Sequence, residues 1–278
     1  MASPTLQRKT LGAELRKLRT AAGGSIEQVA ELLGCSTGKV SHIETGRNSP
    51  SKTELMVLMD HYSLPSDHRK LLEETRQEAR KRGWWSTYRL PSWFRDYVGM
   101  ETDASRVRTF EIELLPGLLQ TEEYMRAINV LGSHITDPSE VERQVALRLE
   151  RQKRLRAEEP LEVTAVISEA SLARCASDPT LAITQFSHLV EAAQQPNILL
   201  QVLPFRTGLH SSMTGSFTLL DFPPETWPPT AYQEYAVGGH LVDEQEAVSA
   251  LSTVFTHLQE RALNVEDSIK LIENYAQA

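Results

Sequence analysis

The most regular hydrophobic pattern in the chain lies in residues 25–48. The first half of this stretch places apolar residues at i, i+3, i+4 and i+7, namely Ile26, Val29, Ala30 and Leu33. This spacing is typical of a short helix with one buried face. Ser25 is followed three residues later by Gln28, which is the sequence of a capping box and predicts that the helix begins here.

A second helix is predicted to follow after a sharp turn. Gly34 stands just past the last apolar residue, where a residue that tolerates positive φ ends a helix, and Ser36 can cap the next one. Val40 and Ile43 are then expected to face the core. The remaining side chains of this helix form a short polar outer face, made of Thr37, Gly38, Lys39, Ser41 and His42.

Three further helices are predicted around this pair. Residues 10–22 carry leucines at i, i+4 and i+7 and end at two glycines, while residues 1–9 are polar and are predicted to be a loose arm. Arg8 and Lys9 in this arm could touch phosphate or could simply be solvated. A capping box at Ser51 begins a fourth helix and Pro65 begins a fifth, so a five-helix domain ends at about residue 80.

Two short helices joined by a turn that contains glycine are the signature of a helix-turn-helix, whose second helix reads bases in the major groove. The stretch resembles the phage-repressor (XRE) type, with Glu44, Gly46, Arg47 and Pro50 in place after the recognition helix. The resemblance implies that Arg19 pairs with Glu44. Ile26 is a departure, because many relatives have a Gln there that supports DNA contacts.

On this interpretation, the protein is a regulator that binds double-stranded DNA at an inverted repeat as a homodimer. The expected DNA-binding residues are Ser36, Thr37, Lys39, Ser41, His42, Arg47 and Asn48, and the expected supporting residues are Arg19, Ser25, Gln28 and Glu44. Arg47 and Asn48 suit phosphate oxygens, which fix position but carry little sequence information.

The charge distribution separates the two ends of the chain. The net charge is -8, but residues 1–82 carry +4 and the remainder carries -12. Because phosphate neutralisation supplies most non-specific affinity for DNA, the acidic remainder argues against nucleic-acid contact there. Two isolated cysteines and the lack of a signal peptide or a long apolar run indicate a cytoplasmic, nucleoid-associated protein with no membrane contact.

Residues 81–100 are predicted to connect two domains, and they contain Trp84, Trp85 and Trp93. A flexible linker would not be so aromatic, since exposed Trp is costly, so the segment is expected to pack against the second domain or a dimer mate. A groove for a ligand or partner is the alternative.

Residues 101–278 predict an α+β or α/β domain. The pattern at 101–110 predicts a helix with Ala104, Val107 and Phe110 inward. Helices are also expected after Thr121, from Asp137, from Asp178 to about residue 194, and over 243–263 and 265–275. Apolar runs within 161–168, 197–205, 216–222 and 230–237 predict strands.

This second half resembles the C-terminal domain of many actinobacterial XRE-type regulators. The resemblance rests on the segment ETDASRVRTFE that starts at Glu101, on the motif PGLLQT at 116–121, and on PNILLQVLPF and GSFTLLDF. The domain is poorly characterised. Because such regulators are commonly encoded beside small proteins, the resemblance implies a companion-protein partner, in toxin-antitoxin-like or developmental regulation. A small-molecule sensor with the tryptophans as pocket wall is the alternative.

No catalytic motif stands out, and we expect no enzyme activity and no cofactor or metal. GxSxG, HExxH, a Walker loop and GxGxxG are all absent. The loop RTGLHSSMTG places Arg206 and His210 beside serines and could contact a ligand or partner, as could Trp227 in a loop with four prolines. The basic run at 148–156 is predicted to be a solvated face, with contact to DNA or an acidic partner as the alternative.

Overall fold

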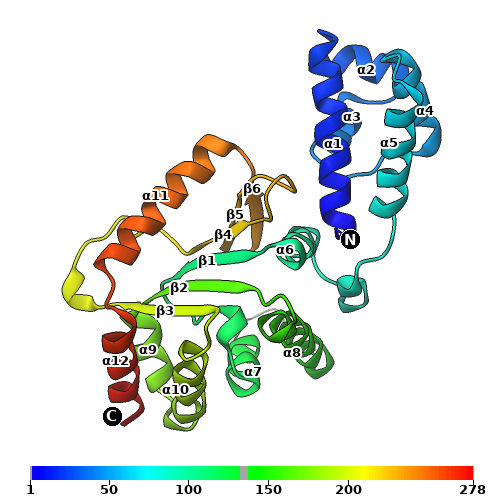
Figure 1. Cartoon of the computed structure of the whole chain (residues 1–278). Coiled ribbons are helices and arrows are strands. Elements are labelled where there is room, and N and C mark those ends of the chain that lie inside the picture. Colours follow the sequence, from blue (N-terminus) through cyan, green and yellow to red (C-terminus); the bar gives the residue numbers. More distant parts are fainter. Residues whose placement is uncertain (1, 132–136, 278) are drawn as a thin grey trace. The chain divides into compact units, whose positions relative to one another are not determined.

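The computed structural model describes residues 2–131 and 137–277. These form two compact units, Met1–Thr87 and Tyr88–Ala278. The first unit is helical, and the second combines helices with a six-stranded mixed sheet (Figure 1). The predicted fold class, a repressor-like helical domain followed by an α+β domain, is therefore confirmed.

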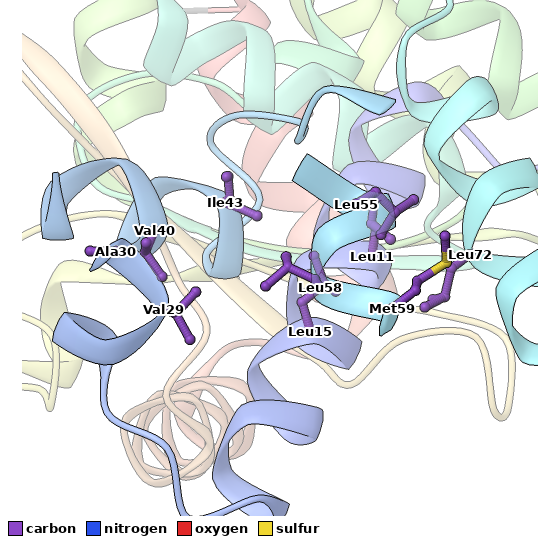
Figure 2. Close-up of a cluster of buried hydrophobic side chains, with 10 residues drawn as sticks. All are labelled: Leu11, Leu15, Val29, Ala30, Val40, Ile43, Leu55, Leu58, Met59 and Leu72. Atoms are coloured by element: carbon purple, nitrogen blue, oxygen red, sulfur yellow. The ribbon is translucent and has the colours of Figure 1, made fainter. Parts of the chain in front are cut away.

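The helices of the first unit surround one apolar core. They are α1 (Pro4–Ala21), α2 (Ile26–Leu33), α3 (Thr37–Glu44), α4 (Lys52–His61) and α5 (Ser66–Ala79), followed by a short 3-10 helix, Trp84–Tyr88. Figure 2 shows the core side chains, which are Leu11, Leu15, Val29, Ala30, Val40, Ile43, Leu55, Leu58, Met59 and Leu72. Leu11, Leu15, Val29, Ala30, Val40 and Ile43 lie at the helical spacing that the sequence predicted for the inward face.

The amino-terminal arm is helical, so the prediction of a loose arm is wrong. Ser3 caps α1, because its hydroxyl oxygen accepts the Leu6 N–H at 3.2 Å, and Pro4 suits the first helical position. The added turn packs against the loop after α3: Arg8 Nε donates to the Gly46 carbonyl at 2.6 Å, and Lys9 is buried beside Gly46.

The second unit is longer and alternates helices with strands. Its helices are α6 (Ser92–Asp103), α7 (Glu122–Leu131), α8 (Pro138–Gln152), α9 (Glu169–Ala176), α10 (Pro179–Ala193), α11 (Gln245–Arg261) and α12 (Val265–Gln277). Its strands are β1 (Arg106–Glu111), β2 (Glu162–Ser168), β3 (Ile198–Leu203), β4 (Phe217–Asp221), β5 (Thr230–Tyr235) and β6 (Gly238–Val242).

The six strands lie in the order β3-β2-β1-β4-β5-β6. β1, β2 and β3 are parallel, and β4, β5 and β6 continue the sheet in antiparallel pairs. Helix α11 packs through Phe255 on the sheet face that carries Phe110 and Phe217, and α7 to α10 lie on the other side of the sheet (Figure 1). The sheet therefore changes from parallel to antiparallel pairing between β1 and β4.

Several local predictions in this unit need correction. The helix predicted at 101–110 is wrong: α6 ends at Asp103, and Arg106–Glu111 is strand β1. Val107 and Phe110 are both buried, but on opposite faces of the sheet. Because buried residues three apart are also typical of a helix, the spacing alone led to the wrong prediction. Helices α6 and α9 and strand β6 were not predicted.

The aromatic stretch does not form one connecting segment. Its second half is helix α6, in which Tyr97 stacks on Phe94 at 5.8 Å and on Tyr232 of β5 at 4.2 Å between ring centroids. Helix α6 is therefore anchored to the sheet of the second unit by its aromatic side chains. Within residues 2–131 and 137–277, no helix has the length and apolar character needed to cross a membrane.

Candidate nucleic-acid interface

The turn between α2 and α3 is fixed by hydrogen bonds at both helix ends. At the start of α2, the Ser25 N–H donates to Gln28 Oε1 at 2.8 Å and the Gln28 N–H donates to Ser25 Oγ at 3.3 Å, which completes the predicted capping box. At its end, Gly34 has φ of 61°, a conformation that costs other residues about 1–2 kcal/mol. Ser36, three residues after the end of α2, caps α3: its Oγ accepts the Lys39 N–H at 3.3 Å.

Helix α3 has one buried side and one exposed side. Val40 and Ile43 are 2% and 3% exposed and belong to the core. The predicted DNA-binding residues lie on the other side and in the following loop: Ser36, Thr37, Lys39, His42, Arg47 and Asn48 are exposed, and Ser41 is half-buried. The structure thus brings these side chains together on one accessible, polar surface, which we call the α3 face.

Arg19 and Glu44 hold α3 against α1. Arg19 Nε and Nη2 donate to the two Glu44 carboxylate oxygens at 2.6 and 2.8 Å, and Arg19 Nη1 donates to the Gly24 carbonyl at 3.0 Å. The side chains are 11% and 7% exposed, and the carboxylate raises the pKa of Arg19. The pairing implied by the family resemblance is present, and it is bidentate, the strong form of such a contact.

Lys39 has a partner that the sequence did not predict. Its ammonium group forms an ion pair with Glu54, and this hydrogen bond raises the pKa of Lys39. The same Glu54 carboxylate accepts the Ser51 N–H at 2.8 Å in the capping box of α4. Glu54 therefore competes for the ammonium group of Lys39 in the free protein. No local sequence pattern signals this pair, because its members are 15 positions apart on different helices.

Thr45 extends the exposed face beyond the residues chosen from the sequence. It follows Ser41 by four residues, its hydroxyl donates to the Ser41 carbonyl at 2.8 Å, and its side chain is exposed. The helical spacing from Ser41 was the available signal. The backbone then turns back, since the Asn48 N–H donates to the His42 carbonyl at 3.0 Å, which places the loop residues beside the end of α3.

The three tryptophans proposed as one cluster belong to different units. Trp84 and Trp85 lie in the first unit and contact each other edge to face at 5.7 Å, with Trp85 buried. Trp93 lies in the second unit on α6, beside Phe94 at 5.6 Å. Trp227 is half-buried in the loop between β4 and β5, where its Nε1 donates to Thr230 Oγ1 at 3.3 Å.

The loop at 206–215 does not have the geometry of an activated nucleophile. The Ser212 N–H donates to His210 Nδ1 at 3.3 Å, but the Ser212 hydroxyl donates to the Gly215 carbonyl at 2.7 Å and the Ser211 hydroxyl points to Val254. Burial lowers the pKa of His210, whose ring lies edge-on to Phe110. Arg206 is exposed on the same loop. In the described parts of the chain, no group of His, Cys, Asp and Glu side chains could hold a metal ion.

The basic run at 148–156 is a solvated face only in part: Lys153 and Arg156 are exposed, whereas Arg148 and Arg151 face inward. Arg151 is buried, and its Nε and Nη2 donate to the two oxygens of Glu101 on α6, both at 2.7 Å. The Tyr97 hydroxyl donates to the same carboxylate at 2.7 Å. Arg148, one turn earlier, is half-buried. The helical spacing of these two arginines places both on the inner side of α8.

Comparison with known families divides the chain in the same way as its fold. A family model described as a helix-turn-helix domain matches residues 10–72, which include the α3 face. A second model, described as a domain of unknown function (DUF5753), matches residues 94–274, well over half of the chain. No curated protein matches the chain.

Proposed function

The chain belongs to the family of the domain of unknown function DUF5753 and carries a helix-turn-helix domain before it, and on this basis we propose a sequence-specific transcriptional regulator of the phage-repressor (XRE) type. The helix-turn-helix domain supports DNA binding by a regulator. The finer proposal is a homodimer that binds an inverted repeat and whose second domain receives a signal.

The observation that carries the proposal is the exposed α3 face. A capped eight-residue helix, held to the core by Val40 and Ile43, presents side chains with hydrogen-bond donors to solvent. The major groove is wide enough to admit such a helix, and each base pair shows a distinct set of donors and acceptors there. In this proposal Lys39 and His42 read bases, together with Ser36, Thr37 and Ser41.

Other residues position the helix rather than read sequence. Arg47 and Asn48 lie exposed in the loop after α3, where they suit phosphate oxygens. The Arg19–Glu44 pair and the Ser25–Gln28 capping box hold α2 and α3 at their relative angle. A single recognition helix contacts few base pairs, and two copies related by a twofold axis would read two half-sites about 34–36 Å apart, one helical turn.

The second domain is proposed to bind a small companion protein. The loop after β3 offers an apolar surface for it, since Phe205, Leu209 and Met213 are 59%, 81% and 57% exposed. Exposed apolar side chains grouped on one loop are typical of protein contact sites. Arg206 and His210 lie on the same loop and would add polar contacts. Control of the regulator by a companion would resemble a toxin-antitoxin or developmental pairing. No catalytic step is assigned to this domain.

The second candidate is a domain that senses a small molecule. It is favoured by Arg148, a half-buried arginine with no carboxylate partner among the described residues. Co-purification of a small protein with the regulator would favour the first candidate. A ligand-dependent rise in thermal stability without any partner would favour the second.

Genome-wide footprinting of the regulator, combined with a pull-down from the same cells, tests both levels of the proposal. The expected result is occupancy of a limited set of sites that share an inverted repeat, with a small protein recovered alongside the regulator. Occupancy without any shared sequence would contradict sequence-specific regulation. Site-specific occupancy without a co-purified protein would contradict only the companion-protein role.

A further inference from the structure

Arg148 differs from the other arginines around it in having no acidic partner at ion-pair distance among the described residues. Arg126 pairs with Glu122 and Glu142, and Arg151 pairs with Glu101. Arg148 is half-buried, yet within residues 2–131 and 137–277 no carboxylate lies at ion-pair distance from it, and its Nη1 donates a long hydrogen bond to Asn129 Oδ1 at 3.5 Å. A partly desolvated cation without a counter-charge in direct contact is costly to maintain.

Asn129, the neighbour of Arg148, has an unused donor. Asn129 lies on α7 and is 8% exposed, and its Nδ2 is buried with no hydrogen-bond partner. The orientation of the amide is chemically sound, because the oxygen faces the cationic guanidinium and a flipped amide would bring two donors together. The unused N–H therefore belongs to the same amide group whose oxygen contacts the guanidinium. Buried polar atoms without partners are rare in folded proteins.

The helix that carries Arg148 lies close to the segment that follows β1. Arg151, three residues after Arg148 on α8, has its Nη1 3.6 Å from where a Cβ on Gly117 would lie, and Gly117 follows β1 in the loop to α7. From β1 the chain crosses through α7 and α8 to β2 on one side, whereas β4 pairs with β1 on the other. Ligands of open sheets with parallel strands bind outside the carboxyl ends of strands at such a change of direction.

The sheet presents polar groups at the same end. The register Phe110↔Phe217 continues to Glu111 beside Ser216, and Thr218↔Tyr232 continues to Ser216 beside Glu234. Burial raises the pKa of Glu111 to about 8, so this carboxyl is largely neutral at pH 7. Burial lowers the pKa of Arg148 to about 10, with Arg151 adding repulsion, so Arg148 still carries its charge at neutral pH. The positive charge of Arg148 is therefore opposed mainly by Glu234, which already accepts the Tyr232 hydroxyl at 2.9 Å.

We infer that Arg148 and Asn129 form a binding site for the anionic head group, carboxylate or phosphate, of a small ligand. A carboxylate or phosphate presents two or more oxygens, one of which can accept from the guanidinium while another accepts from Asn129 Nδ2. Such charge-assisted hydrogen bonds are about twice as strong as neutral ones. The anion would supply both a counter-charge in direct contact with Arg148 and the missing acceptor for Asn129 Nδ2. The site belongs to the second domain and does not depend on DNA binding.

The two sources of the anion can be separated by titration of the full chain without DNA. The probes are inorganic phosphate and acetate, each compared with chloride at equal ionic strength. The readout is the Nε–Hε resonance of Arg148 in protein labelled with ¹⁵N-arginine. A saturable shift with phosphate, with acetate or with both supports the site and identifies the anion class. No saturable shift with either anion would overturn the inference.

Asn129→Asp provides a variant that tests the site without removing Arg148. The new carboxylate would lie beside the guanidinium and supply its counter-charge from within the protein. We expect anion binding to weaken about tenfold or more, while the thermal midpoint stays equal or rises. Unchanged anion affinity in Asn129→Asp would overturn the inference.

Arg143→Gln is the matched control for net charge. Arg143 lies on the same helix, but it pairs with Glu140 on the surface. Its replacement should leave anion affinity within about twofold of wild type, whereas Arg148→Gln should weaken it about tenfold or more. Equal losses in the two variants would overturn the inference, because they would show a general charge effect.

Discussion

Arg19 at the end of α1 and Glu44 at the end of α3 form a bidentate ion pair, with nitrogen to oxygen distances of 2.6 and 2.8 Å. The pair joins positions 25 residues apart in sequence and is largely shielded from solvent. It sets the position of the recognition helix relative to the rest of the first domain. The proposed reading of DNA by the α3 face depends on this relation.

Arg19→Ala is expected to destabilise the first domain strongly. The substitution leaves the Glu44 carboxylate buried without a counter-charge, and breaking a buried pair in this way costs about 3–5 kcal/mol. The loss should appear as a lower urea midpoint for the first domain. Arg16→Ala, at an exposed position of the same helix, is the control and should change stability by less than about 0.5 kcal/mol. Similar effects of the two variants would contradict a structural role for the pair.

Lys39→Ala is expected to weaken binding to the specific site by about 1–3 kcal/mol, the range for a base contact. Titration of the variant with the specific site and with random duplex DNA measures the difference. A loss confined to the specific site agrees with base reading. An equal loss on both DNAs would instead identify Lys39 as a phosphate contact.

Glu54→Gln tests whether Glu54 and DNA compete for Lys39, by removing the charge of Glu54 and keeping Lys39. Gln can replace Glu in the capping box of α4, so the helix start is retained. The variant removes the anion that holds Lys39 in the free protein, and it should therefore bind the specific site more tightly. Titration at two salt concentrations checks this, because the gain should shrink as salt screens the charge. Weaker binding by a folded Glu54→Gln protein would show that the ion pair orients Lys39 for DNA.

Gly12→Ala is expected to destabilise the packing of α1 on α3. A Cβ at this position would lie 2.3 Å from the Ile43 carbonyl oxygen, which is part of the backbone and cannot move away cheaply. Overpacking of this kind costs about 1–3 kcal/mol and outweighs the gain in helix propensity of about 0.5–1 kcal/mol. Urea unfolding shows whether the variant is less or more stable than wild type, with Thr10→Ala at an exposed site of α1 as the control. A more stable Gly12→Ala protein would contradict the close approach of the two helices.

Glu111 is expected to make the second domain less stable as pH rises. Burial raises its folded-state pKa from the ordinary value of 4.5 to about 8. Between these values the folded state holds a proton that the unfolded state has released, so stability falls with increasing pH, by at most about 1.4 kcal/mol per pH unit. Unfolding of wild type and Glu111→Gln at about pH 5 and pH 8 tests this. The stability of Glu111→Gln should fall less between about pH 5 and pH 8 than that of wild type. An equal fall in both proteins would contradict the raised pKa of Glu111.

The first domain was largely predictable from its sequence because its signals are local. Capping residues such as Ser25 and Ser51 stand directly before apolar residues at helical spacing, and the structure confirms both capping boxes. The start of α1 was missed because Ser3 and Pro4, which begin it, stand in a polar segment that looked like a loose arm. The Lys39–Glu54 pair was missed because it depends on how two separate helices pack.

The second domain was less predictable because its sheet is buried on both faces. In β1, Val107 and Phe110 point to opposite sides and are both buried, so the alternation that identifies a half-buried strand is absent. The basic run at 148–156 was taken for a surface, because composition alone cannot show that Glu101 would lie against Arg151. The relation of Arg148 to Asn129 could likewise not be predicted, since it depends on the packing of α7 on α8.

Selection of binding sites from random duplex oligonucleotides by the purified full-length protein at moderate salt tests the central claim most directly. The account predicts enrichment of one inverted repeat with half-sites about one helical turn apart, and loss of this enrichment in a folded Lys39→Ala, His42→Ala double variant. Recovery of oligonucleotides with no shared sequence by the wild-type protein would contradict the claim that the α3 face reads DNA.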